Sequence, residues 1–164
     1  MINELLLKQV AILSALAGGV LGFLTIFPYI NIFSVTILVI CLAACILIYM
    51  KRENLIGIFD MKEGAILGGV IGFVSFIAAA IVYIPCDLIL GLIPVGFFKA
   101  HFLMRFFLNS FGSFIVLVML TLFVALLSGM MNAFAGLATS YVYEVLTGLK
   151  KESNESINFD IKWG

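Results

Sequence analysis

Gly64-Ala-Ile-Leu-Gly-Gly-Val-Ile-Gly-Phe73 opens a long apolar run, and its closing hexapeptide matches Gly18-Gly-Val-Leu-Gly-Phe23 of an earlier apolar run at five of six positions. In both runs small residues recur at every fourth position, so at about 3.6 residues per turn they share one helix face. In lipid, such a face lets two helix backbones approach closely, which supplies contact that hydrophobicity cannot supply there. The pattern predicts helix packing on two small-residue faces: Ser14, Gly18 and Gly22, then Gly64, Gly68 and Gly72.

The composition is that of an integral membrane protein. Of 164 residues, 64% are hydrophobic and 11% charged, with a mean hydropathy of +1.26. A soluble domain carries about 25% charged residues, and a membrane-spanning helix needs about 20 apolar residues. The formal net charge is zero, so nothing indicates nucleic-acid binding. We expect an all-α polytopic protein in contact with the lipid bilayer.

Turn signals divide the chain into one transmembrane domain, 1–149, and a polar tail, 150–164. Pro28 disfavours helix for the residue before it, and Asn31 is a candidate cap for the next helix. Asp60 with Glu63 resembles a capping box, and Pro85 is expected to end the third span. The four predicted spans, arranged as two antiparallel hairpins with an internal repeat at an offset of 50, are 9–27, 32–50, 62–84 and 111–143.

Segment 86–110 is expected to lie at the interface. Its first apolar stretch is too short to span the bilayer and suggests an interfacial or re-entrant piece. The rest has the pattern of an amphipathic helix lying flat on the membrane. Its polar residues could hold a lipid head group or an anionic ligand, but an ordinary solvated face of an amphipathic helix is the favoured interpretation. These residues are Asp87, Lys99, His101 and Arg105.

The last span carries a third small-residue face, which includes Gly129, Ala133 and Gly136. Asn132, in mid-span, predicts either a hydrogen bond between helices or part of a polar path. The glycines could serve static packing or allow helices to slide. The tail after residue 149 is expected to be a disordered segment or, from its alternating apolar residues, a docking strand.

Basic residues predict the orientation, because they favour the cytoplasmic side of a membrane. With the N-terminus inside, only Lys99 and Arg105 fall outside. We therefore expect both termini in the cytoplasm, at a bacterial inner membrane. The basic residues inside are then Lys8, Lys51, Arg52, Lys62, Lys150, Lys151 and Lys162.

The first three spans resemble a class of small four-span bacterial integral membrane proteins with glycine-rich first and third spans. The resemblance covers residues 11–84, and that class has no assigned activity, so it implies a fold and no site. The residues that carry it are Gly18, Gly22, Phe27-Pro28-Tyr29-Ile30-Asn31, Ala44, Tyr49, Lys51-Arg52, Gly64-Ala65, Gly68 and Gly72.

The spans offer little for chemistry. Between Gln9 and Tyr49, and between Gly64 and Pro85, the chain has no Asp, Glu, Lys, Arg or His, although buried charges usually mark transport or catalysis. A single histidine does not suggest a zinc site. We expect no enzyme activity, cofactor or metal. The leading hypothesis is a packing module that associates with itself or with a partner membrane protein; the alternatives are a small oligomeric channel or transporter and a lipid-binding protein.

Overall fold

The computed structural model describes residues 4–27, 29–53, 60–91 and 111–161, and in these segments the regular structure is entirely helical. Four stretches are long and apolar enough to cross a membrane: Glu4–Leu24, Asn31–Arg52, Met61–Asp87 and Phe114–Thr147. The predicted all-α, four-span fold is confirmed. The helices are α1 (Glu4–Leu24), α2 (Asn31–Thr36), the π-helical segment η1 (Ile37–Cys41), α3 (Leu42–Arg52), α4 (Met61–Gly91) and α6 (Phe111–Ile161).

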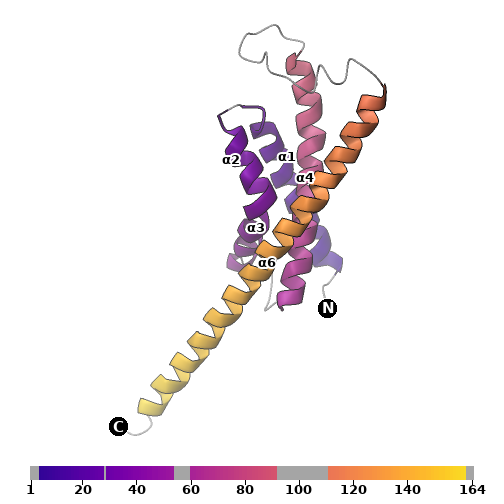
Figure 1. Ribbon diagram of the computed structural model, residues 1–164. Helices are drawn as coiled ribbons and strands as arrows, with labels where there is room; N and C mark the ends of the chain where they lie inside the picture. The colour runs from indigo at the N-terminus through magenta and orange to yellow at the C-terminus, as the bar shows by residue number, and fades with distance from the viewer. Residues whose placement is uncertain (1–3, 28, 54–59, 92–110, 162–164) are drawn as a thin grey trace.

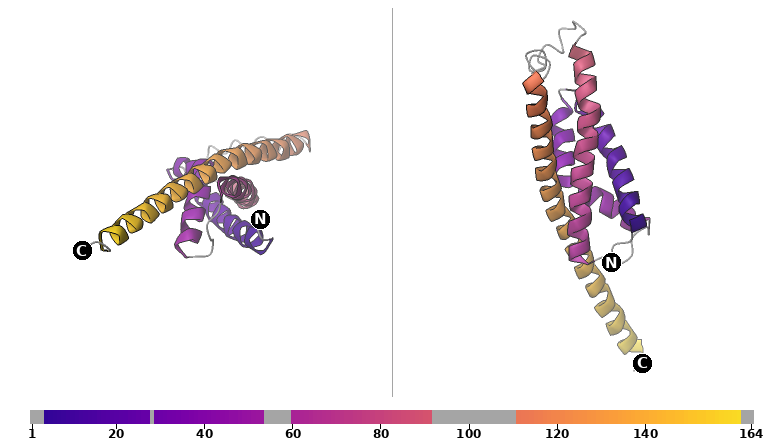
Figure 2. Two further views of the ribbon diagram at one scale, coloured as in Figure 1. Left: turned by 90° about the horizontal axis from the view of Figure 1, so that it is seen from below. Right: turned by 90° about the vertical axis from the view of Figure 1, so that its right-hand side faces the viewer.

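Helix α4 is the centre of the bundle. It packs against α1 on one side and against α6 on another, and α6 also contacts η1 and α3 (Figures 1 and 2). Both chain ends lie at the same end of the bundle (Figure 1). Large apolar side chains such as Leu16, Val20 and Phe134 are exposed on the outside of the bundle, as expected for helices that face lipid rather than water.

The second span begins without a side-chain cap. Ile30 holds the cap position and Asn31 is the first helical residue, so the predicted cap at Asn31 is wrong. The N–H groups of Ile30 and Asn31 both donate to the Phe27 carbonyl, so the turn itself supplies their partners. At the start of α4 the Asp60 carboxylate accepts the N–H of the next residue, Met61, at 2.8 Å, and its negative charge is favourable at a helix N-terminus.

Helix α4 runs through Pro85 to Gly91, so the predicted end of the third span at residue 84 is wrong. Residues 86–91, the start of the expected interfacial segment, continue this helix. A proline removes one helical hydrogen bond, but an apolar segment in lipid has no water to satisfy its backbone and therefore stays helical. The rest of the expected interfacial segment, 92–110, lies outside the described residues.

Helix α6 contains 51 residues, which at a rise of 1.5 Å per residue is about 75 Å. That length is more than twice the roughly 30 Å hydrocarbon core. The helix continues to Ile161, so the expected disordered tail or docking strand is wrong over 150–161. Extending an existing helix requires no new nucleation, which is the costly step of helix formation. Figure 1 shows the C-terminal part of α6 projecting from the bundle.

Candidate functional site

The glycine face of α4 lies directly against α6. A Cβ on Gly72 would stand 2.5 Å from the Ser128 carbonyl oxygen and 2.7 Å from Asn132 Cβ. A Cβ on Gly68 would overlap the Asn132 carbonyl oxygen, with the Ala133 Cα 3.1 Å away. Gly64 faces the Ser140 side chain and Gly136, and Gly129 faces Phe73 across the same interface. The absence of side chains here lets the two backbones touch.

The glycine face of α1 lies against α4. A Cβ on Gly18 would stand 2.6 Å from Ser75 Cα, and one on Gly22 would stand 2.6 Å from Ala79 Cα. Ser14 is buried and donates to the Val10 carbonyl within its own helix. The two copies of the repeated motif thus have different neighbours. The copy in α1 packs against α4, a helix of the other hairpin, whereas the copy in α4 packs against α6, its partner in the same hairpin. The predicted packing faces are filled by helices of the same chain.

Asn132 joins α6 to the π-helical segment of the second span. Its Oδ1 accepts the Ala43 N–H at 2.8 Å, and its Nδ2 donates to the Leu38 and Val39 carbonyls at 3.0 and 2.9 Å. A π-helical turn interrupts the regular pattern in which each backbone N–H donates to the carbonyl four residues earlier. The Asn132 amide supplies hydrogen-bond partners to backbone groups on both sides of that turn. The Asn132 side chain is fully buried, so it forms an interhelical bond of the kind the sequence suggested.

Ser128 extends this junction to a third helix. Its hydroxyl lies 3.1 Å from the Gly72 carbonyl oxygen on α4 and 3.3 Å from the Leu38 carbonyl oxygen on η1. Ser128 and Asn132 are one helical turn apart on α6, and Asn132 Nδ2 lies 3.0 Å from the Ser128 carbonyl oxygen, so its two N–H groups are shared between this carbonyl and those of Leu38 and Val39. We call Ser128, Asn132 and the backbone of Leu38, Val39, Ala43 and Gly72 the polar junction. It connects three candidate membrane spans near the middle of each span.

The predicted head-group residues fall in different parts of the chain. Asp87 is buried near the end of α4, one helical turn beyond Tyr83. Lys99, His101 and Arg105 lie outside the described residues, so the structure brings no cluster of the four together.

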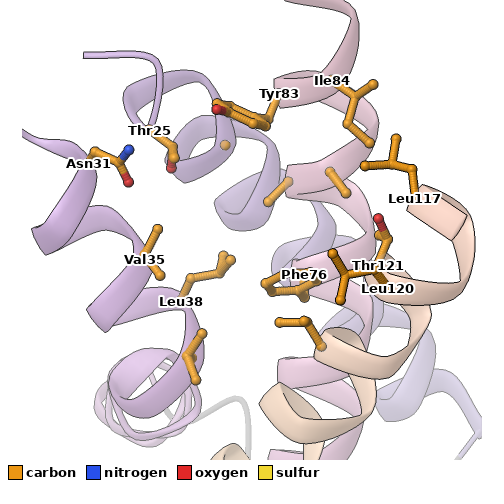
Figure 3. A pocket seen from close by; sticks show the side chains of 15 residues that line it. Thr25, Asn31, Val35, Leu38, Phe76, Tyr83, Ile84, Leu117, Leu120 and Thr121 are labelled. Carbon is orange, nitrogen blue, oxygen red and sulfur yellow. The ribbon is translucent and has the colours of Figure 1, made fainter. Parts of the chain in front are cut away.

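A pocket that the sequence did not predict lies above the polar junction, toward the end of the bundle opposite the chain termini. It has a volume of about 350 Å³ and is bordered by α2, η1, α4, α6 and the end of α1 (Figure 3). The side chain of Leu38, whose carbonyl belongs to the polar junction, lines its lower part. The full lining is Gly22, Thr25, Asn31, Val35, Leu38, Val39, Phe76, Ala79, Ala80, Tyr83, Ile84, Leu117, Leu120, Thr121 and Val124.

Three of the four polar side chains of this pocket gather at one end, and the fourth, Thr121, lies beside Leu117 and Leu120 on α6. Figure 3 shows the Tyr83 hydroxyl turned toward Thr25, with Asn31 beside Thr25, whereas Leu38 and Phe76 lie deeper. The Thr25 hydroxyl donates to the Leu21 carbonyl at 2.8 Å and keeps its lone pairs for a further bond. All the residues that form the pocket lining are uncharged.

The polar end of the pocket lies at the edge of the hydrocarbon core. Helix α1 has 21 residues, about the length that crosses a core of roughly 30 Å. Thr25 and Asn31 flank the turn that follows it, so they belong to the interfacial zone. The apolar end points toward the middle of the bilayer, so the pocket has the polarity profile of one membrane leaflet.

Among the described residues, no group of three or more His, Cys, Asp or Glu side chains could hold a metal ion. Comparisons with models of protein families, with curated protein sequences and with solved structures find no match for this chain.

Proposed function

We propose that this multi-pass membrane protein binds one amphipathic lipid molecule in the pocket between its second, third and fourth spans. The observation that carries the proposal is the separation of polarity in the lining, with Thr25, Asn31 and Tyr83 at the interfacial end and Leu38 and Phe76 below. Ligand pockets of proteins are mostly apolar cavities with a few polar groups that fix orientation, and they occupy about 300–1,000 Å³.

The polar groups favour a neutral head group. A hydroxyl, a phenol and a carboxamide can donate and accept hydrogen bonds without a charge, and they suit a hydroxyl, ester or amide. An anionic head group would enter a low-dielectric site without a cation in the described lining, which is costly. Of the three functions expected from the sequence, lipid binding is the one that the form of this pocket favours.

The protein released from membranes with its lipids attached tests the proposal. Native mass spectrometry should find one amphiphile bound per chain. Val35→Trp fills the pocket from α2, where Val35 is 40% exposed, and should abolish that bound mass. The matched control is Ile32→Trp on the same helix, since Ile32 is 75% exposed and lies outside the lining. Equal lipid occupancy in both variants would refute the site.

Association with a second copy or a partner membrane protein remains our second proposal, on a different surface from the glycine faces. A groove of about 500 Å³ between the second span and α6 is lined partly by small residues, including Cys41, Ala44, Ala135 and Ala138. Small residues favour helix contact in lipid. Ala138→Leu should lower the oligomer fraction in detergent, whereas Leu126→Ala, a lipid-facing change on the same helix, should not.

We place the protein in a bacterial inner membrane with both termini in the cytoplasm. The support is the excess of basic residues that this orientation puts inside. The pocket then belongs to the outer leaflet.

A further inference from the structure

A second cavity adjoins the pocket on the opposite side of the α4–α6 pair. This groove has a volume of about 370 Å³, and in the described part of the chain its lining comes from α4 and α6 alone. It therefore faces the bilayer directly. Four residues line both cavities: Ala80, Ile84, Leu117 and Thr121.

The two cavities exist because α4 and α6 separate above their closest approach. At Gly72 the backbones touch, with the Ser128 carbonyl oxygen 2.5 Å from an added Cβ. Toward the other end of the bundle the facing positions carry larger groups such as Phe76 and Leu117, which hold the backbones apart. Figures 1 and 2 both show the upper ends of the two helices apart. Between them stand Ala80 and Thr121, whose side chains are small.

We infer that the bound amphiphile has a single long chain, which passes between α4 and α6 at Ala80 and Thr121 into the lipid-facing groove. This inference rests on the proposed function and adds the class of ligand. A pocket of about 350 Å³ is near the lower limit for ligand sites, so a long chain must continue beyond it. The adjoining groove gives the chain an apolar path, and its opening onto the bilayer lets the chain enter sideways.

The same geometry selects against bulky lipids. The inferred path is bordered by the four side chains that line both cavities, so we expect it to admit one linear chain and to exclude a second chain or a fused ring system. A long-chain monoacylglycerol has the required form, because its hydroxyls and ester match the uncharged polar groups at Thr25, Asn31 and Tyr83.

Photolabelling of the full-length protein in phosphatidylcholine vesicles tests this path. Two long-chain monoacylglycerol probes are compared, one with a diazirine beside the ester and one with a diazirine at the end of the chain. The first probe should label the polar end of the pocket, near Thr25 and Tyr83. The second should label the groove near Ile81 and Val118.

Thr121→Phe adds bulk at the passage, and Ala80→Leu does so independently from α4. Either variant should reduce labelling of the groove by the chain-end probe about tenfold, because overfilling a packed site is unfavourable. Leu126→Phe is the control on α6, since Leu126 is 58% exposed and lies outside both linings. Circular dichroism and gel filtration of all three variants exclude misfolding as the cause.

The outcomes separate this inference from the proposed function. If both probes label only the pocket, the path is wrong and lipid binding stands. The same conclusion follows if the chain-end probe labels the groove equally in the wild-type protein and in both variants. If neither probe labels the pocket above the level of exposed lipid-facing residues, the proposed function itself fails.

Discussion

The Asn132 side chain completes the hydrogen-bond ladder of the second span by accepting the Ala43 N–H at 2.8 Å, across 89 residues of sequence. Its Nδ2 donates to the Leu38 and Val39 carbonyls on the other side of the interruption. A backbone group without a partner is costly in lipid, so the π-helical segment depends on α6. The same contact fixes Leu38, which lines the pocket, and thereby links bundle stability to the shape of the candidate site.

Asn132→Leu should therefore destabilise the protein. The change leaves three backbone groups of the second span without their side-chain partner. Interhelical hydrogen bonds in membranes contribute about 0.6–2 kcal/mol each, so we expect a loss of about 1–3 kcal/mol. Unfolding in mixed micelles measures it, and amide exchange at Ala43 should accelerate. Met131→Leu is the control, since Met131 is 45% exposed. Unchanged stability would mean that the backbone groups of the second span find hydrogen-bond partners without Asn132.

Two adjacent glycines of α4 should respond in opposite ways to the same substitution. Gly68→Ala places a methyl group against the Asn132 carbonyl oxygen of α6, where backbone must move. We expect a destabilisation of about 1–3 kcal/mol. Gly69→Ala meets nothing closer than 3.7 Å, so it should be neutral or stabilising by up to about 1 kcal/mol, given the helix preference of alanine.

The unfolding free energies of these two variants are measured in mixed micelles. Gly68→Leu should lower the unfolding free energy more than Gly68→Ala does. The pair controls for helix propensity, because both positions lie in the middle of the same helix. Equal effects at Gly68 and Gly69 would show that backbone contact between α4 and α6 does not hold the bundle together.

The spans and their small-residue faces could be predicted because they are local properties of the chain. Apolar length predicts each span, and spacing by fours places Gly64, Gly68 and Gly72 on one face. Spacing does not name the partner helix, so the sequence could not show that Gly18 faces Ser75 while Gly68 faces Asn132. The helix end predicted from Pro85 is wrong, because a backbone in lipid stays helical even where a proline removes one backbone hydrogen bond.

Neither the π-helical segment nor the pocket could be predicted from the sequence. Ile37–Cys41 is an ordinary apolar stretch, and what distinguishes it is a side chain nearly a hundred positions later. The only available signal was Asn132 itself, a polar residue in mid-span. The pocket arises from the angle between α4 and α6, and its polar groups, Thr25, Asn31, Tyr83 and Thr121, come from four separate parts of the chain, so no local pattern contains it.

Tyr83→Phe should weaken binding of a neutral single-chain amphiphile about two- to tenfold, because one hydrogen bond contributes about 0.5–1.5 kcal/mol. The aromatic ring stays, so the volume and packing of the pocket are preserved. Titration of a monoacylglycerol into the protein in nanodiscs measures the affinity. Tyr141→Phe is the matched control, since Tyr141 is 53% exposed on α6 and lies outside the pocket lining. Identical affinities for the two variants would remove Tyr83 from the site.

A reporter fused after Gly164 should be active in the cytoplasm. Four spans return the chain to the side on which it began, and the basic residues near the helix ends favour that side being inside. The orientation also decides which leaflet supplies the ligand, because the pocket lies toward the end of the bundle opposite the termini. A pair of fusions measures this, one to alkaline phosphatase and one to green fluorescent protein, since the first is active only in the periplasm and the second fluoresces only in the cytoplasm. Phosphatase activity would invert the protein and move the pocket to the inner leaflet, so the photolabelling would then have to deliver its probes from the cytoplasmic side.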